Sequence, residues 1–312
     1  MIVYKELSSL VSDLGFSART LYSVSNSISD HYRTTFLPKD DGGVRELSVP
    51  DPLLKSIQKQ ISEVLLPLEP ISPYATGYRP GGSTRKNALP HVGKPLVLKL
   101  DIRHFFDNII YPTVKKAFPS DRYSEQNRIL LALLCSFRDT LPQGAPTSPG
   151  ISNIIMRDFD FAVGQWCDSH AISYTRYCDD MTFSGEFDPA SVIAMVRNEL
   201  QKTGLFLNES KTTVVHKGQK QQVTGIVVNE AAHIPNDYKR KIRQEMYFCK
   251  KYGVSAHLDH LGTKISPEAY TASMLGRVNY VLSVEPSNSE MLHYRDCLLY
   301  TSPSPRDYAA SR

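Results

Sequence analysis

Two adjacent aspartates, Asp179 and Asp180, lie between two segments that have the composition of β-strands. Residues 172–177 read Ile-Ser-Tyr-Thr-Arg-Tyr, and residues 181–184 read Met-Thr-Phe-Ser. Because Asp disfavours strands and favours turns, this pattern predicts a β-hairpin with two carboxylates at its tip. Neighbouring carboxylates repel each other unless a cation neutralises them. A lone pair of this kind is most often a solvated acidic turn, so the surrounding sequence has to decide.

A third carboxylate, Asp101, ends an apolar segment that is predicted to be a strand over residues 96–101. A helix over 150–166 precedes the hairpin, and a helix between Asp188 and Gly204 and a strand over 205–215 follow it. The order β-α-β-β-α-β predicts a split βαβ sheet. We expect residues 96–101 and the first hairpin strand to be its central neighbours. Asp101, Asp179 and Asp180 then converge, as two-metal sites require.

The composition is that of a soluble globular protein of about two domains, with 312 residues, 41% of them hydrophobic and 22% charged. The longest apolar run, residues 129–135, is too short to span a bilayer. The N-terminus lacks the pattern of a signal peptide. The five cysteines are widely spaced and form no CxxC pair, which argues against zinc and disulfides. These features predict a protein of the reducing cytoplasm without a membrane partner.

Basic residues concentrate in one part of the chain. Residues 211–251 contain nine Lys or Arg and three acidic residues, within a chain of net charge +4. Helical spacing separates an apolar face that includes Ile242 and Met246 from a basic face that includes Lys239 and Arg243. Such a face is often only solvated surface. Near a metal site of carboxylates, contact with a phosphate backbone is the better interpretation.

Together these residues resemble the reverse transcriptases, and among them the bacterial retron type. The resemblance extends over about residues 30–290 and rests on five motifs: Asp101 with Phe105-Phe106, residues 141–149 (LPQGAPTSP), Tyr177-Cys178-Asp179-Asp180, Asn87 to His91 (NALPH), and Val223-Thr224-Gly225. Cys178 stands where retron enzymes usually have Ala.

The resemblance implies an α+β fold of the right-hand polymerase type. It divides the chain into N-terminal helices and part of the fingers (1–94), a palm with a split βαβ, ferredoxin-like sheet and an interleaved fingers segment (95–229), and a helical thumb (230–296).

The resemblance also implies catalytic roles for Asp101, Asp179 and Asp180. These carboxylates, with the Ile102 carbonyl as a further ligand, are expected to hold two Mg²⁺ ions, for which Mn²⁺ can substitute. Hard oxygen ligands suit both metals. Phe106 is expected to be the steric gate that favours deoxynucleotides, or alternatively a core residue.

Several further residues are candidates for contact with the nucleotide. Gln143 is expected to contact the nucleotide sugar or the template, and Gly144 to allow a close backbone approach, unless Pro-Gln-Gly is an ordinary turn.

Asp40 to Gly43 predict the turn of a hairpin between residues 34–37 and 44–49, which resembles the fingers. Arg45 on that hairpin is the first candidate for the triphosphate, ahead of Arg79 and Arg85. Lys211 resembles the lysine that protonates the departing pyrophosphate. Each of these cations has the alternative of being a plain surface residue.

The remaining motifs are assigned to RNA or the primer. Val223, Thr224 and Gly225 are expected on a strand over 222–229 as part of the primer grip, and Gly225 alternatively marks a bulge or a close backbone approach. Asn87 and His91 belong to the retron signature. His91 is either an RNA contact or a buried, hydrogen-bonded histidine.

The last residues depart from this pattern. Residues 297–307 (CLLYTSPSPRD) resemble the translation of a transposase adapter used in sequencing libraries. We therefore expect the native gene to be cut near Asp296, with a short native thumb segment missing after it. We expect residues 297–312 to be disordered because of their Pro-rich composition.

The predicted function is RNA-directed DNA synthesis. The expected partners are dNTPs and a cognate structured noncoding RNA, which serves as template and primes from a 2′-hydroxyl. The expected product is single-stranded DNA joined to RNA, in an anti-phage system with a separate effector protein. One alternative is a group II intron-like reverse transcriptase, although the chain after Gly225 is short for its additional domains. The other is a non-catalytic RNA-binding scaffold, which has no need of three buried aspartates.

Overall fold

The computed structural model describes residues 2–38 and 42–301. The chain forms two compact units. Unit 1 consists of residues 1–83 and 96–214, and unit 2 consists of residues 84–95 and 215–312. Among the described residues, none of the helices combines the length and the apolar character needed to span a bilayer. The division into fingers, palm and thumb stays a prediction.

The central sheet has the strand order β4-β5-β3-β6, and its strands are β3 (Leu96–Asp101), β4 (Ser173–Tyr177), β5 (Asp180–Gly185) and β6 (Thr213–His216). This order confirms the split βαβ sheet. The predicted neighbour of β3 was wrong, because β3 pairs with the second hairpin strand, β5, and not with β4. The crossover from β3 to β4 leaves room for one strand between them, and the hairpin returns into that gap. Asp101 consequently lies directly opposite Asp180.

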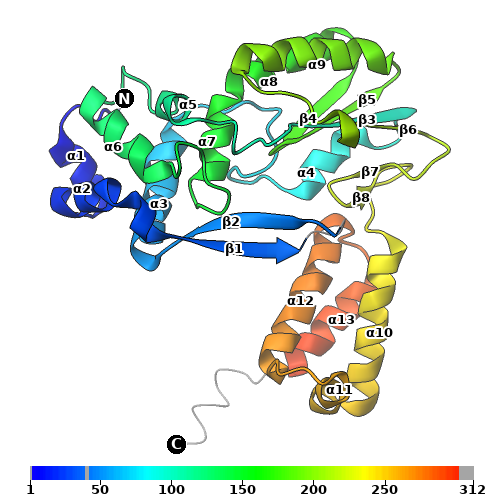
Figure 1. Ribbon diagram of the computed structural model, residues 1–312. Coiled ribbons are helices and arrows are strands. Elements are labelled where there is room, and N and C mark those ends of the chain that lie inside the picture. The colour runs from blue at the N-terminus through cyan, green and yellow to red at the C-terminus, as the bar shows by residue number, and fades with distance from the viewer. Residues whose placement is uncertain (1, 39–41, 302–312) are drawn as a thin grey trace, which may run out of the picture. The chain divides into compact units, whose positions relative to one another are not determined.

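Helices α8 (Arg157–Ser169) and α9 (Pro189–Thr203) lie along the sheet (Figure 1). Helix α9 is as predicted: the Asp188 carboxylate accepts hydrogen bonds from the first backbone N–H groups, and Gly204 ends the helix with φ 77°. The side chains of Val192, Val196 and Leu200 are fully buried. Helix α9 thus contributes one apolar stripe to the core of unit 1.

Two predicted elements of unit 1 are divided in the structure. The expected helix over 150–166 is two helices, α7 (Ser148–Ile155) and α8, because the backbone at Met156 leaves helical geometry with ψ 0°. The expected strand over 205–215 contains a 3₁₀ turn at Glu209–Lys211, and only β6 pairs as a regular strand at its end. This turn directs Lys211 back toward Asp101.

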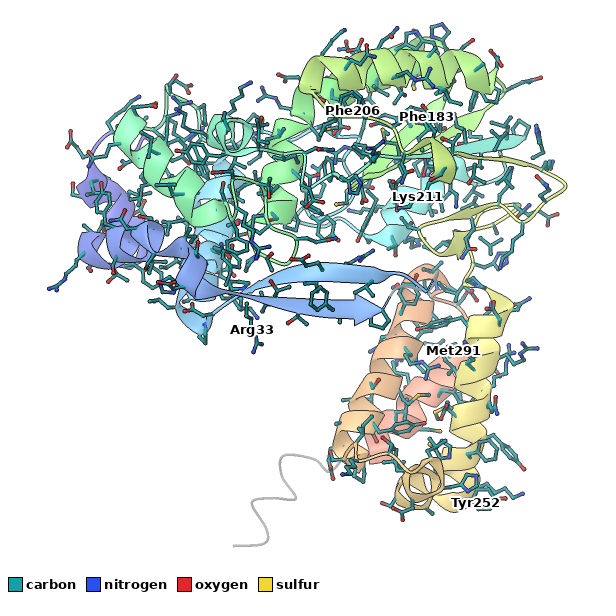
Figure 2. All side chains as sticks on the ribbon, viewed as in Figure 1. Arg33, Phe183, Phe206, Lys211, Tyr252 and Met291 are labelled. Atoms are coloured by element: carbon teal, nitrogen blue, oxygen red, sulfur yellow. The ribbon has the colours of Figure 1, made fainter. Side chains whose placement is uncertain are left out.

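A long antiparallel hairpin, β1 (Tyr32–Pro38) and β2 (Val44–Pro50), confirms the prediction for residues 34–37 and 44–49. Asp40 and Asp41 of its predicted turn lie outside the described residues. The other helices of unit 1 are α1 (Leu7–Leu14), α2 (Ala18–Asn26), α3 (Pro52–Gln60), α5 (Tyr111–Lys116) and α6 (Glu125–Cys135). Figure 2 places Phe183 of β5 between sheet and helix, where it is fully buried.

Unit 2 contains α4 (Thr84–Ala88), a small hairpin and four further helices: α10 (Asn236–Tyr252), α11 (Val254–Leu261), α12 (Pro267–Val284) and α13 (Ser289–Thr301). The predicted strand over 222–229 is instead the hairpin β7 (Gln222–Val223) and β8 (Ile226–Val227). Thr224 (φ 44°) and Gly225 (φ 83°) form its two-residue turn, and positive φ at both positions is the geometry that such turns require. Gly225 is therefore a turn residue and not a bulge.

The predicted disorder from residue 297 onward is wrong for its first five residues. Residues 297–301 continue α13, and the side chain of Leu298 is 3% exposed. Burial of this leucine gives the segment a reason to order that its composition does not reveal. Residues 302–312 lie outside the described residues.

Candidate active site

The carboxylate of Asp101 is held at the end of β3 by two side chains from the segment before β6. Its side chain is 6% exposed. Asn208 donates a hydrogen bond to Asp101 Oδ1 over 3.0 Å, and the Lys211 ammonium donates to Oδ2 over 2.8 Å. Each carboxylate oxygen thus accepts a hydrogen bond, and the two bonds together fix the orientation of the carboxylate. Figure 2 labels Lys211 beside the sheet.

The hairpin tip brings the other two aspartates to the same end of the sheet. Asp180 begins β5 opposite Asp101, and the Asp179 carbonyl accepts a hydrogen bond from the Ile102 N–H over 3.1 Å. The residue before them, Cys178, has φ 61° and is buried. The predicted convergence of the three aspartates on one edge is therefore present, and Ile102 links the strand end to the hairpin.

The two hairpin aspartates are electrostatically destabilised in the ionised form. Desolvation and the charges of Asp179 and Asp101 raise the pKa of Asp180 to about 6. The pKa of Asp179 is also raised, first by burial and further by Asp101, while Lys211 opposes the shift. In Lys211 the hydrogen bond to Asp101 raises the pKa, so its ammonium stays protonated at neutral pH. Such strain among like charges is relieved by a cation.

Within residues 2–38 and 42–301, no three His, Cys, Asp or Glu side chains are close enough to enclose an ion as they stand. The donors are nevertheless of the kind that Mg²⁺ and Mn²⁺ prefer, namely carboxylate oxygens with a backbone carbonyl beside them. The raised pKa values of Asp179 and Asp180 show that added positive charge is favourable at this edge. The residues thus fit a divalent metal chemically, and the Lys211 ammonium pairs with the Asp101 carboxylate over 2.8 Å.

A cavity of about 970 Å³ opens beside the aspartates within unit 1. Its wall brings together seven of the predicted residues, namely Arg45, Asp101, Ile102, Phe106, Gln143, Asp179 and Lys211. It also includes Arg103 and Arg138, which were not predicted. Arg45 and Arg138 are exposed, and Arg138 reaches Glu46 of β2 over 3.4 Å. No motif marks Arg103 or Arg138 in the sequence. Only their place in the cavity shows that they could meet an anionic ligand.

The segment around Gln143 is fixed against the β1–β2 hairpin. The Gln143 carbonyl accepts a hydrogen bond from the Ser48 N–H over 2.8 Å. Gly144 has φ 121°, and a Cβ at this position would lie 2.8 Å from the Ser48 carbonyl oxygen. The close approach that was predicted at Gly144 is thus to β2. Ser148 closes the same loop by donating to the Pro142 carbonyl over 2.7 Å.

The two retron signatures meet inside unit 2. Asn87 of α4 is 1% exposed and donates to the Thr224 hydroxyl over 3.3 Å, and that hydroxyl in turn donates to the Thr84 carbonyl over 3.3 Å. Val223 is fully buried, whereas Gly225 at the turn is exposed. The signature residues therefore shape an exposed turn, and only Thr224 and Gly225 reach its surface.

His91 is a buried residue, and the prediction of a direct RNA contact is wrong. Its side chain has no exposed surface. Burial lowers the pKa of its imidazole to about 3, so the ring is neutral at physiological pH. Of the two alternatives that the sequence left open, the structure selects the core histidine.

Two residues of the predicted basic face of α10, Lys239 and Arg243, form ion pairs within unit 2. Lys239 lies on the buried side of the helix with Ile242 and Met246, and its ammonium pairs with Glu285 over 2.9 Å. The prediction that Lys239 lies on a different face from Ile242 and Met246 was therefore wrong. Its ion pair with Glu285 neutralises the ammonium, which allows the side chain to be buried. Arg243 is more exposed but pairs with Glu290 over 2.8 Å.

Arg79 also turns away from its predicted role as a triphosphate contact. Its guanidinium donates to the carbonyls of Ser72 and Ala75 over 2.9 and 3.2 Å. These bonds close the loop that precedes the exposed Tyr78, whose ring centre lies 5.5 Å from that of Tyr177. Arg79 is thus a residue that shapes this loop.

Comparison with known proteins agrees with the geometry. The chain matches the family described as reverse transcriptase (RNA-dependent DNA polymerase) over residues 37–228. It is 31% identical over 286 residues to the retron Mx65 reverse transcriptase of Myxococcus xanthus, covering 85% of this chain and 64% of that protein. The retron Mx162 reverse transcriptase of the same organism is 32% identical over 257 residues, covering 71% and 53%. The retron Ec86 reverse transcriptase of Escherichia coli is 27% identical over 270 residues, covering 85% and 78%.

The chain spans less than two thirds of the length of the two Myxococcus relatives. The matched region nevertheless contains the three aspartates, the Gln143 loop and the Thr224–Gly225 turn. Members of the family generally use divalent metals, in keeping with the oxygen donors at the sheet edge. This chain, an α+β protein of the right-hand polymerase type, belongs to the reverse transcriptase family and within it to the retron type.

Proposed function

We propose that this protein is an RNA-directed DNA polymerase that copies part of a structured noncoding RNA into single-stranded DNA. The observation that carries the proposal is the placement of Asp101 opposite Asp180 at one edge of the sheet, where Asp101 and Asp179 line a cavity of about 970 Å³. The names of the relatives support the retron assignment. A cavity of this size suits a nucleotide.

The aspartates at the sheet edge and Lys211 have distinct roles in this reaction. Asp101, Asp179 and Asp180, with the Ile102 carbonyl, would hold two Mg²⁺ ions. When bound, the metal supplies activation of the primer hydroxyl and neutralisation of the triphosphate. Lys211, kept protonated by its hydrogen bond to Asp101, holds the proton for the departing pyrophosphate.

The other residues bind and orient the nucleotide. The exposed Arg45 pairs with the triphosphate, because its planar guanidinium matches phosphate oxygens. Phe106 lies beneath the sugar and excludes a 2′-hydroxyl, and Gln143 contacts the sugar or the template. Arg103 and Arg138 add positive charge to the same wall.

The partner in this proposal is a cognate structured RNA that serves as template and primes from a 2′-hydroxyl. The product is single-stranded DNA joined to RNA. In unit 2, the exposed turn at Thr224 and Gly225 is the part of the signature residues that is accessible to RNA or primer. We extend the proposal to a role in anti-phage defence with a separate effector protein, on the ground of the similarity to retron reverse transcriptases.

Primer extension tests the activity. Wild-type protein is incubated with an RNA template, a DNA primer, Mg²⁺ and the four dNTPs, beside Asp179→Ala and the control Asp259→Ala. Asp259 is an exposed residue of α11, so its loss leaves the sheet edge intact. We expect extension by wild type and control, and a loss of at least about 10³-fold in Asp179→Ala.

RNA binding is measured on the same samples. RNA binding by wild-type protein without extension would favour a non-catalytic scaffold. Equal extension by wild type and Asp179→Ala would contradict the assigned site. Sequencing of the RNA that co-purifies with the protein then distinguishes a retron transcript from a group II intron.

A further inference from the structure

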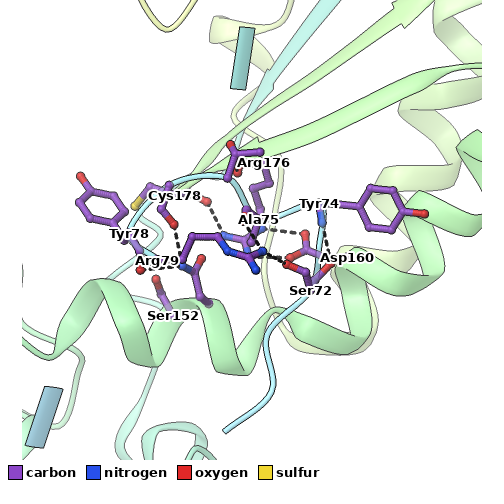
Figure 3. A network of polar contacts seen from close by, with 12 residues as sticks. Ser72, Tyr74, Ala75, Tyr78, Arg79, Ser152, Asp160, Arg176 and Cys178 are labelled. Carbon is purple, nitrogen blue, oxygen red and sulfur yellow. Dashed lines mark hydrogen bonds and ion pairs between the residues drawn. The ribbon is translucent and has the colours of Figure 1, made fainter. Parts of the chain in front are cut away.

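A fully buried arginine lies two residues before the hairpin tip. Arg176 of β4 has no exposed surface. Its guanidinium makes two parallel hydrogen bonds to the Asp160 carboxylate of α8, each 2.7 Å long, and a third of 2.8 Å to the Cys178 carbonyl (Figure 3). Tyr174 donates to the same carboxylate over 2.9 Å. The network therefore connects a helix behind the sheet with the backbone of the hairpin.

Stability alone is a weak reason for such a network. Burying two charges costs solvation energy that their attraction only roughly returns, and apolar groups of the same volume often serve a protein core equally well. The network differs from a simple ion pair in one respect. The third guanidinium donor is directed at a backbone carbonyl of the hairpin tip, which apolar side chains could not hold.

That carbonyl belongs to a strained residue. Cys178 has φ 61°, in the left-handed region that is unfavourable for a residue with a Cβ. Such backbone conformations persist only where the surroundings fix them. Here the Arg176 guanidinium holds the Cys178 carbonyl, and the Ile102 N–H holds the next carbonyl, that of Asp179, over 3.1 Å. Two consecutive peptide groups are thus held on either side of the Asp179 side chain.

The backbone of Arg176 is itself fixed. Its N–H donates to the Tyr74 carbonyl over 2.8 Å, and its carbonyl accepts from the Thr76 N–H over 2.9 Å. Figure 3 shows Arg176 between Asp160 on one side and Cys178 on the other, with Ala75 beside it. The guanidinium therefore projects from a rigid base toward the hairpin tip.

We infer that Arg176 is a positioning residue for nucleotidyl transfer: anchored by Asp160, it holds the Cys178 carbonyl and thereby sets the place of the Asp179 carboxylate. This inference rests on the proposed polymerase activity. Loss of the guanidinium then lowers the rate of the chemical step more than it weakens nucleotide binding, because Arg45, Phe106 and Gln143 lie on other elements.

Two variants test the inference. Arg176→Lys keeps the charge, but its single ammonium cannot replace the planar fork that reaches both Asp160 and Cys178. The second is the triple variant Arg176→Met/Asp160→Leu/Tyr174→Phe, which replaces the whole polar network by apolar groups and leaves no buried charge unpaired. The matched control is Arg122→Lys, because Arg122 likewise pairs with a buried carboxylate, Glu69, over 2.8 Å and holds the Leu68 carbonyl, far along the chain from the hairpin.

Single-turnover incorporation and hydrogen exchange are measured on each folded variant. We expect the rate constant of the triple variant to fall by about 10- to 100-fold, with the KM for dNTP changed by less than about threefold. Without metal, backbone amides of residues 177–181 should exchange faster than in wild type, whereas Arg122→Lys keeps both the rate and the exchange of wild type.

The outcomes separate the inference from the proposed function. A wild-type protein that extends no primer contradicts the polymerase proposal itself. An active wild type with a folded triple variant of the same rate, or with unchanged exchange at residues 177–181, overturns the role of Arg176. If the triple variant does not fold, Arg176→Lys decides by the same two measurements.

Discussion

Phe106 lies half-buried in the cavity wall, while its neighbour Phe105 is 3% exposed and belongs to the core. The two ring centres are 5.3 Å apart, so Phe105 supports the position of Phe106. Because Phe105 is buried in the core whereas Phe106 lines the cavity, a steric role of Phe106 is favoured over the alternative of a core residue.

Removing the ring should admit ribonucleotides. We expect Phe106→Ala to increase the ratio of rNTP to dNTP incorporation by about 10- to 100-fold, which is the size of discrimination that a steric pocket provides against one hydroxyl. Incorporation of each nucleotide is measured separately as kcat/KM. Phe206→Ala, which removes an exposed ring outside the cavity, serves as control. An unchanged ratio in Phe106→Ala would rule out the gate.

The buried His91 makes the stability of the chain depend on pH. An unfolded histidine takes up a proton near pH 6.5, whereas burial keeps the folded His91 neutral down to about pH 3. Because the unfolded state binds more protons in this window, stability is lost as the pH falls from 6.5 toward 3.

We predict that the free energy of unfolding depends less on pH in His91→Gln than in wild type. Between pH 7.5 and 5, the free energy of unfolding of wild type should fall by about 2 kcal/mol more than that of the variant. Urea unfolding at both pH values provides the comparison. His216→Gln, which changes an exposed histidine, should behave as wild type. An equal change in the free energy of unfolding for wild type and His91→Gln between the two pH values would show that His91 is protonated in the folded state.

At the scale of elements, the Gln143 loop and β2 depend on one glycine. Gly144 combines φ 121° with a contact that leaves no room for a Cβ beside the Ser48 carbonyl. A side chain there must push the loop away from β2 and break the hydrogen bond between Ser48 and Gln143. Gln143 would then no longer be held in a fixed position relative to Arg45 on the β1–β2 hairpin.

We expect Gly144→Ala to reduce kcat/KM for dNTP by about 10- to 100-fold, as a displacement of about 1 Å in a positioning element does. The protein should remain folded, which a thermal melt checks. Gly218→Ala is the matched control, because Gly218 has no atom within 4 Å of an added Cβ and no positive φ. Equal kinetics in both variants would mean that the loop adjusts without cost.

The β4–β5 hairpin also determines the reactivity of the Cys178 thiol. Burial and the neighbouring Asp179 raise the pKa of its thiol, so the reactive thiolate is disfavoured. Burial of Cys178 in the hairpin therefore protects its thiol from oxidation.

At the scale of the whole molecule, the last described helix contributes to the stability of unit 2. Leu298 is 3% exposed, and Met291, two turns earlier on α13, is fully buried (Figure 2). Truncation after Asp296 should therefore lower the free energy of unfolding by about 2 kcal/mol, the value of one buried leucine.

Truncation after Thr301 removes only residues outside the described part of the chain and provides the comparison. Differential scanning calorimetry of both truncations and the full chain measures the effect. A Tm after truncation at Asp296 equal to that of the full chain would show that residues 297–301 add nothing to the fold.

The sequence by itself determined the features that depend on residues close together in the chain. The ends of α9 at Asp188 and Gly204, the strand that ends at Asp101 and the hairpin with two aspartates at its tip were all predicted correctly. Turn residues, helix caps and alternating apolar residues act over a few positions, so they are readable without a fold.

The tertiary structure decided which distant groups meet. Lys211 bonds to Asp101 across 110 residues, Arg176 pairs with Asp160 of another element, and His91 and Lys239 are buried although they are polar. It also placed β5 rather than β4 beside β3. Such pairings follow from how packed elements exclude water and share hydrogen bonds, and local sequence preference carries no information about them.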